Sequence, residues 1–306
     1  MKKISTFCLL VLAITIKTTV VSSQTTGSLP KLLIRLDDIG MNHSVNMAAE
    51  KVAETGMPVS VSLQFACPWY QEAVEILKKH PNVCIGVHLT LTNEWKNYRW
   101  GPVLGPSTVP SLVDSLGYFY QSTGAFSKSG YKLDEVEKEL SAQIERALHS
   151  GAKITYIDPH MGIALSTPEL RALTEKLALK YHLAISPLSS VTYFSETYKE
   201  MWAEPIATKK SAFLEYLSHL NPNRPNLMVL HTATPSPEMD AMIDMNSRMM
   251  SDKDGNSIVS QHRQTELNAL LSPEFKNMIG NKFELTNYEQ LLKGRDISVL
   301  KAVDGK

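Results

Sequence analysis

The chain has 306 residues, 31 acidic and 31 basic side chains, and 43% hydrophobic and 20% charged residues. This composition excludes a disordered chain, and the zero net charge excludes a broadly basic nucleic-acid-binding protein. Three cysteines in a chain of this length exclude a disulfide-dense scaffold.

Residues 1–23 have the features of a secretory signal peptide. Two lysines follow Met1, a ten-residue segment from Phe7 to Ile16 is apolar except for Thr15, and small residues end the segment. An apolar segment of ten residues is too short to span a bilayer, so we expect cleavage. The alternative is an N-terminal anchor or a buried helix. Cleavage predicts a secreted or periplasmic mature protein with no membrane span, beginning with a short linker over 24–30.

Beyond the linker, apolar runs alternate with helical patterns. Runs of apolar or β-branched residues predict seven strands, at Lys31–Leu36, Pro58–Ala66, Val83–Leu91, Lys153–Ile157, Leu183–Ser186, Leu227–His231 and Lys282–Leu285. Apolar residues at helical spacing predict the helices His43–Thr55, Tyr70–Lys79, Leu133–Leu148, Pro168–Tyr181, Ser211–Leu220 and Gln261–Leu271.

Strands that alternate with helices of this length predict parallel βα units. About seven strands indicate a single closed or nearly closed TIM-like βα barrel, which we expect to occupy residues 31–306 as one domain. The segment 92–130 is too long for a plain connection and contains several aromatic residues among glycines and prolines. Loops of this length are usually lids or subsites.

Acidic and imidazole side chains lie at four of the expected strand ends. They are Asp37 and Asp38, His88, Asp158 and His160, and His231. In βα barrels the strand ends meet at one face, so these groups are expected to converge. One carboxylate and two imidazoles form a three-ligand Zn²⁺ site with positions left open for water and substrate. Zn²⁺ would lower the pKa of its water, a second carboxylate could act as base, and a further imidazole as acid.

Adjacent side chains on an extended strand point to opposite faces. We therefore expect Asp37 and Asp38 to diverge, so that one binds a metal ion while the other handles a proton.

Three segments, LIRLDDIGMNHSVN, IGVHLTLT and YIDPHMG, resemble the motif regions of the YdjC-like family, also called the ChbG/HpnK family of carbohydrate deacetylases. The resemblance extends from Leu32 to Leu291. It implies an irregular barrel of the glycoside hydrolase/deacetylase type and metal-dependent removal of an acetyl group from an N-acetylated sugar or oligosaccharide. Two departures are visible: the third motif lacks a second histidine, and His231 is followed by Thr-Ala instead of Pro-Gly.

The resemblance also implies residue roles. Asp38, His88 and His160 would be the metal ligands, Asp37 the general base and His231 the acid. The ligand set favours Zn²⁺, with Mg²⁺ as the alternative. QHRQTELNALL resembles the family's late Arg-x-x-Glu element, which contains Arg263 and Glu266.

Other candidates have structural alternatives. Asp158 would orient His160 from behind. Trp95 and Trp100 would stack on sugar, or else fix their loop to the barrel. Arg263 would bind substrate, or else form a helix-surface salt bridge with Glu266.

Two other protein classes remain open: a glycoside hydrolase with paired carboxylates, and a non-catalytic sugar-binding barrel. Cys67 and Cys84 are expected at opposite ends of neighbouring parallel strands, so no disulfide is predicted between them.

Overall fold

The computed structural model describes residues 28–189, 195–299 and 301–302, so the expected signal peptide lies outside the described residues. A parallel sheet forms its centre. The strands of this sheet are β1 (Lys31–Ile39), β2 (Val59–Leu63), β3 (Val83–Leu89), β4 (Ile154–Pro159), β5 (Ala184–Ile185), β7 (Thr197–Glu200), β8 (Asn226–Leu230) and β9 (Glu284–Thr286). A separate antiparallel pair consists of β6 (Leu188–Ser189) and β10 (Lys301–Ala302).

The spatial order of the sheet is β5-β4-β3-β2-β1-β8-β7, and β9 pairs with β1. β1 therefore has three partners. β8 pairs along one edge, and on the other edge β9 pairs with the first residues of β1 and β2 with the last ones. No pairing joins β5 to β7 among the described residues, so the barrel is open between them. This architecture confirms the expected parallel βα barrel.

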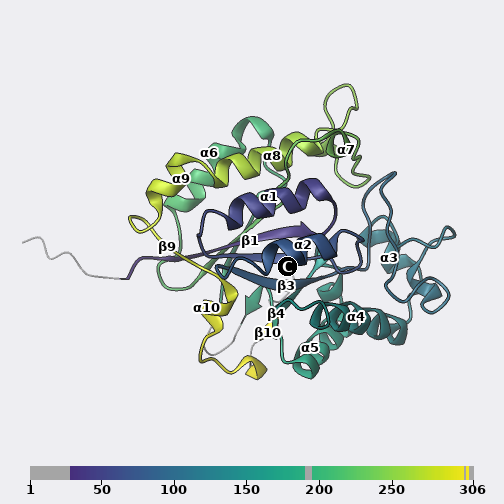
Figure 1. Ribbon diagram of the computed structural model, residues 1–306. Coiled ribbons are helices and arrows are strands. Elements are labelled where there is room, and N and C mark those ends of the chain that lie inside the picture. The colour runs from purple at the N-terminus through teal and green to yellow at the C-terminus, as the bar shows by residue number, and fades with distance from the viewer. Residues whose placement is uncertain (1–27, 190–194, 300, 303–306) are drawn as a thin grey trace, which may run out of the picture.

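Helices cover the outside of the sheet (Figure 1). The helices are α1 (His43–Ala53), α2 (Tyr70–Leu77), α3 (Thr123–Lys128), α4 (Leu133–Leu148), α5 (Pro168–Tyr181), α6 (Ile206–Ser218), α7 (Pro237–Asp240), α8 (Val259–Leu270), α9 (Pro273–Met278) and α10 (Tyr288–Leu292). Helix α1 begins where the Asn42 side chain accepts a hydrogen bond from the Val45 N–H. The short helix α3 and its neighbouring loops lie on the right of Figure 1, toward which the arrow of β1 points.

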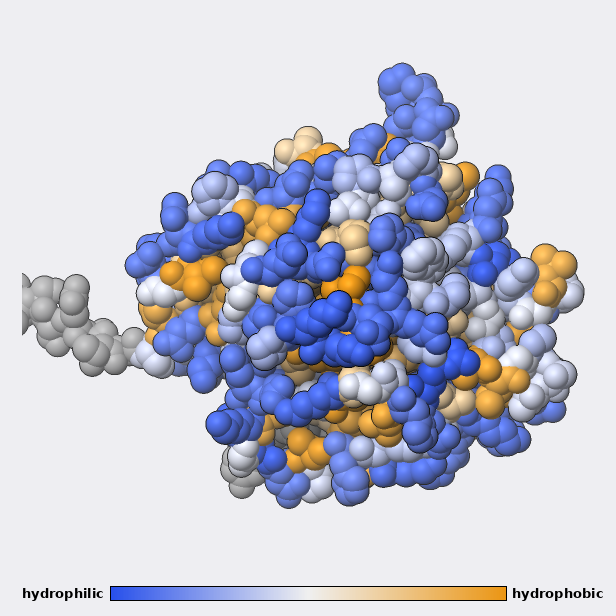
Figure 2. Space-filling model, viewed as in Figure 1, coloured by the Kyte–Doolittle hydropathy of each residue, from blue (hydrophilic) through white to orange (hydrophobic). Residues whose placement is uncertain are grey.

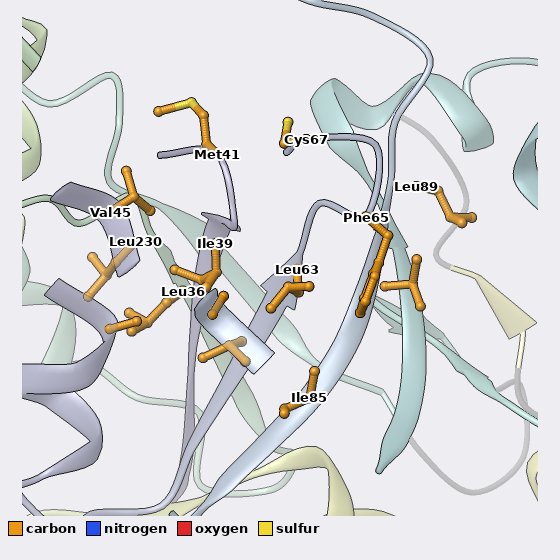
Figure 3. Close-up of a cluster of buried hydrophobic side chains, with 14 of the residues drawn as sticks. Leu36, Ile39, Met41, Val45, Leu63, Phe65, Cys67, Ile85, Leu89 and Leu230 are labelled. Carbon is orange, nitrogen blue, oxygen red and sulfur yellow. The ribbon is translucent and has the colours of Figure 1, made fainter. Parts of the chain in front are cut away.

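Two apolar clusters lie on opposite faces of the sheet because side chains alternate along each strand. The outer cluster packs the sheet against the helices; Figure 3 shows its part around Leu36, Leu63 and Ile85. The smaller inner cluster fills the barrel with side chains such as Leu33 and Tyr156. Helix α10 adds Tyr288, Leu291 and Leu292 to this inner cluster.

All seven expected strands are present, although their ends shift by a few residues. Strand β7 was not predicted, because its sequence Thr-Tyr-Lys-Glu is polar and every second residue is exposed. The segment 92–130 contains a 3₁₀ turn at Pro110–Leu112 and helix α3. In the described part of the chain, none of the helices is both long and apolar enough to cross a membrane.

Both described cysteines are buried and unpaired. Cys84 pairs with Ser60 near the start of β2, whereas Cys67 follows the end of β2, so the two cysteines lie at opposite ends of neighbouring strands. Burial raises the pKa of the Cys84 thiol to about 11, consistent with a small apolar side chain.

On the molecular face in Figure 2, apolar groups of atoms are interrupted by hydrophilic ones.

Candidate active site

The end of β1 brings two buried carboxylates to one place. The pairing register with β2 shifts between Leu36 and Ile39, and Asp38 has a left-handed φ of 64°. This backbone breaks the alternation expected of an extended strand. Asp37 Oδ2 lies 4.0 Å and Asp38 Oδ1 3.6 Å from the same atom, His88 Nε2. The expected divergence of the two aspartates is therefore wrong: a bulge turns both toward the same side.

The two carboxylates nevertheless have different partners. Arg35 forms a bidentate pair with Asp37, with Nε–Oδ1 and Nη2–Oδ2 distances of 2.7 Å. The same guanidinium lies 3.3 Å from Asp158 Oδ2 and donates from Nη1 to Ser186 Oγ at 2.7 Å. Asp37 is thus fixed by a buried cation from its own strand, in a geometry that arginine provides and lysine does not.

His88 is oriented from its far side by Asp158. Its Nδ1 lies 2.7 Å from Asp158 Oδ2, so Nε2 faces Asp37 and Asp38. We expected Asp158 to orient His160; instead it bonds to His88, because β3 and β4 pair with these two residues side by side. Burial lowers the pKa of His88, but the charges of Asp158 and Asp37 outweigh it and raise the pKa to about 10.

His160 approaches the same centre from the end of β4. Its Nδ1 lies 3.3 Å from Asp38 Oδ1 and 3.3 Å from His88 Nε2, and its Nε2 lies 3.0 Å from Glu94 Oε2. Met161 and Gly162 follow with left-handed φ values of 51° and 72°, which turn the chain sharply after the imidazole. Burial opposes protonation, but Glu94 and Asp38 raise the pKa of His160 to about 9.

Two overlapping sets of side chains have donor atoms within 4.8 Å of one another: Asp38, His88 and His160, and Asp37, His88 and Asp158. In the second set, both carboxylates, Asp37 and Asp158, already contact the Arg35 guanidinium. The first set is buried and combines one carboxylate with two imidazoles, a donor set suited to a divalent cation such as Zn²⁺. The first set therefore fits a metal ion better.

Helix α8 closes the other side of Asp38. Arg263 is buried and its Nη2 lies 2.6 Å from Asp38 Oδ2, while its Nη1 has no hydrogen-bond partner among the described residues. Burial alone would raise the pKa of Asp38, but Arg263, together with His160, His88 and His231, holds it well below its ordinary value.

Glu266 does not pair with Arg263. It lies 2.7 Å from Lys209 Nζ and accepts the His231 N–H at 2.5 Å. Leu36 pairs with Leu230, so His231 follows β8 at the level of Asp37 on the neighbouring strand. The His231 Nδ1 is buried with no hydrogen-bond partner in the described part of the chain. The backbone of His231 is thus fixed by Glu266, while its ring Nδ1 remains available to bond to a substrate.

The two expected sugar-stacking tryptophans are buried, with Trp95 2% and Trp100 4% exposed. The Trp100 Nε1 donates to the Thr92 carbonyl oxygen at 3.1 Å, and its ring lies 6.1 Å from that of His160. The Arg263 guanidinium lies 5.5 Å above the Trp95 ring. These contacts favour a role in fixing the loop over the centre and leave little ring surface for a sugar.

Sequence reasoning missed Arg35, Gln64 and Glu94. Gln64 Nε2 donates to Asp38 Oδ1 at 3.0 Å and lies 3.2 Å from His160 Nδ1. Arg35 lies in β1, and Gln64 directly follows β2 in step with the polar side chains Ser60 and Ser62. This alternation of polar residues is the signal that could have identified them. Glu94 follows β3 in the long loop, and no periodic pattern marks it.

An open parallel βα barrel with buried carboxylates and imidazoles at its strand ends has the architecture of enzymes that use the carboxyl face of a barrel. The family model for YdjC-like proteins matches residues 31–281. The chain therefore belongs to the YdjC-like family.

Relatives and a solved structure agree with this assignment. The chain is 33% identical over 178 residues to a carbohydrate deacetylase of Enterococcus faecalis (57% of this chain, 64% of the relative). It is 30% identical over 155 residues to one of Brevibacillus brevis (51% of this chain, 58% of the relative). These matches span less than two thirds of each relative.

A solved Enterococcus faecalis structure named for cellobiose-phosphate cleavage superposes with a TM-score of 0.68 at 26% identity. The superposition covers 86% of this chain and 99% of that one, which supports the barrel fold.

Proposed function

We propose that this protein is a metal-dependent hydrolase that removes the acetyl group of an N-acetylated sugar or oligosaccharide. The main support for this proposal is that the donor atoms of Asp38, His88 and His160 lie within 4.8 Å of one another. Directly beside them lies the carboxylate of Asp37, which is paired with Arg35. The names of the relatives, carbohydrate deacetylases, support the substrate class.

Asp38, His88 and His160 would hold one divalent cation, with Zn²⁺ favoured over Mg²⁺ by the two imidazole donors. When bound, such an ion lowers the pKa of water and polarises a carbonyl oxygen. Asp158 fixes the ring of His88, so that Nε2 stays directed at the centre. Arg263 keeps Asp38 ionised and therefore able to bind a cation.

Asp37 acts as the general base and accepts a proton from the water that attacks the acetamide carbon. Its bidentate pair with Arg35 holds the carboxylate in one orientation. His231, on the neighbouring strand, donates a proton to the departing sugar nitrogen, and acetate leaves. In sum, water adds across the C–N bond and yields a free amine and acetate.

A glycoside hydrolase would need one neutral carboxylic acid as proton donor. Arg263 and the imidazoles hold the pKa of Asp38 well below its usual range, which argues against this class. A binding protein without chemistry would not need a buried Arg35–Asp37 pair beside the three donors.

The proposal is tested by acetate release from N-acetylglucosamine oligomers, together with the metal content of the purified protein. We expect Asp37→Asn to keep its metal and lose about 10²–10⁴-fold in rate. Asp38→Asn should lose the metal. Asp134→Asn, an exposed carboxylate on α4 paired with Lys138, is the matched control and should change neither.

Equal metal loss in the Asp37 and Asp38 variants would show that the roles of the pair are wrongly assigned. Absence of acetate release by wild-type protein loaded with Zn²⁺ or Mg²⁺ would overturn the proposed activity.

Export is part of the proposal and rests on the sequence of residues 1–23 alone. Fractionation of expressing bacterial cells, with and without this segment, tests it: retention of the full-length chain in the cytoplasm would contradict export.

A further inference from the structure

A chain of hydrogen bonds leads from the Arg35 guanidinium into the interior of the barrel. Two nitrogens of the guanidinium, Nε and Nη2, bind Asp37, and the third, Nη1, donates to Ser186 Oγ at 2.7 Å. The Ser186 hydroxyl is hydrogen-bonded to the Tyr288 hydroxyl, which donates to Glu196 Oε2 at 3.2 Å. The chain therefore joins β1, the residue after β5 and the first residue of α10.

The hydrogen bonds of this chain run in one direction, away from Arg35. A guanidinium has donors only, so Ser186 Oγ accepts from it and has its own proton left to donate to Tyr288. At the far end, Glu196 Oε2 also accepts the Leu188 N–H at 2.8 Å, so this oxygen acts as an acceptor. A carboxyl oxygen can accept whether or not the other oxygen carries a proton, so the chain does not depend on the charge of Glu196.

The two hydroxyl groups lie on residues that are fully buried and whose backbones are fixed. Ser186 and Tyr288 are both 0% exposed. The Ser186 N–H donates to the Ile157 carbonyl oxygen at 2.9 Å, and the Tyr288 N–H donates to Ser60 Oγ at 3.1 Å. Ser60 pairs with Arg35 in the sheet, so Tyr288 is anchored at the level of the guanidinium's own residue.

The guanidinium lies between two carboxylates. Its bidentate bonds to Asp37 are 2.7 Å long, and Asp158 Oδ2 lies 3.3 Å from Nη2. Rotation of the guanidinium toward Asp158 would break the bidentate pair. The bond from Nη1 to Ser186 opposes this rotation, because rotation would leave a buried donor without its acceptor.

We propose that Ser186 and Tyr288 are positioning residues for Asp37, and that they act by holding the plane of the Arg35 guanidinium. The inference rests on the proposed function for the role of Asp37 as general base. It adds that two hydroxyl groups from β5 and α10 determine the orientation of that base. A catalytic group misplaced by about 1 Å can cost about 10²-fold in rate, so this orientation matters for the reaction.

The first test measures acetate release from N-acetylglucosamine oligomers by metal-loaded protein. We expect Tyr288→Phe to lower kcat about tenfold and to leave KM within about twofold, and Ser186→Ala to lower kcat at least as much. Tyr216→Phe is the matched control, because it removes a half-buried hydroxyl that bonds to the Thr197 carbonyl oxygen, and it should change neither constant. An unchanged kcat in Tyr288→Phe overturns the proposal.

The second test separates positioning from a general loss of structure. In the Asp37→Asn background the base is already absent, so adding Tyr288→Phe should change the remaining rate by less than about twofold. A purely structural effect would lower the rate about tenfold in both backgrounds, and that result overturns the positioning role.

The third test does not need activity. Rotation about the Nε–Cζ bond of Arg35 exchanges Nη1 and Nη2, and nitrogen NMR of arginine-labelled, Zn²⁺-loaded protein measures its rate; Arg35→Met identifies the signals. Tyr288→Phe should accelerate this rotation about tenfold, as expected for a weakened hydrogen bond. Equal rates in Tyr288→Phe and wild type overturn the positioning role. Faster rotation in a protein whose wild type releases no acetate supports the chain and refutes the proposed activity instead.

Discussion

Arg35 is the most informative single perturbation of the barrel interior. It is 3% exposed, and its guanidinium serves Asp37, Asp158 and Ser186 together. Arg35→Met keeps an unbranched apolar stem of similar length but leaves the buried Asp37 without its bidentate cation and Asp158 with His88 as its remaining charged partner. Removal of one partner from a buried ion pair costs about 3–5 kcal/mol, because the remaining charge stays desolvated.

We therefore expect Arg35→Met to lower the free energy of unfolding by about 3–5 kcal/mol, measured by urea denaturation of chelator-treated protein. The chelator prevents a bound cation from masking the effect. The double variant Arg35→Met/Asp37→Asn should be more stable than Arg35→Met alone, because one uncompensated carboxylate is gone. Arg224→Met, a surface arginine bonded to Thr197, should stay within about 0.5 kcal/mol of wild type.

A loss below about 1 kcal/mol in Arg35→Met would refute the reasoning, since it would mean that the carboxylates are solvated or protonated without the guanidinium. Equal stability of the single and double variants would show that Asp37 is not the charge that Arg35 compensates.

Two further predictions concern buried groups away from the catalytic proposal. Burial raises the pKa of Glu196 to about 7 from 4.5, so the folded state retains a proton that the unfolded state releases, and stability falls as pH rises from about 4.5 to 7. Glu196→Gln should remove this pH dependence and raise the free energy of unfolding at pH 8 by up to about 3 kcal/mol, with little change at pH 4. If urea denaturation gave the same change of stability with pH for both proteins, the prediction would be contradicted. Gly86→Ala would put a Cβ 2.4 Å from the Tyr156 ring and should cost about 1–3 kcal/mol in thermal unfolding, whereas Gly124→Ala, which meets nothing closer than 3.9 Å, should be neutral or stabilising. An unchanged Tm for Gly86→Ala would show that the ring moves freely.

The barrel and much of the candidate site could be predicted because both depend on short-range patterns. Apolar runs separated by helical spacing identify strands, and parallel strands bring their carboxyl ends together. This reasoning suffices to predict that the polar groups at the ends of β1, β3 and β4 converge. The choice of Asp38, His88 and His160 as the metal-ligand set comes from the family resemblance.

Other features depend on contacts that no local pattern encodes. The left-handed backbone of Asp38 arises from the shifted register against β2, and it reverses the expected direction of one aspartate. The guanidinium that covers the Trp95 ring comes from Arg263, which lies far along the chain. Similarly, Glu94 reaches His160 only because its loop folds back over the barrel.

The pairing of β1 with β9 has a consequence for how the protein is made. Lys31 pairs with Glu284, and Leu36 with Leu230, so the first strand is completed by residues that are synthesised much later than the strand itself. Contacts of such long sequence separation form slowly, since a large loop must close first. The two aspartates at the end of β1 therefore acquire their neighbours late, and a growing chain shorter than about 230 residues holds them without the strand that fixes one side of β1.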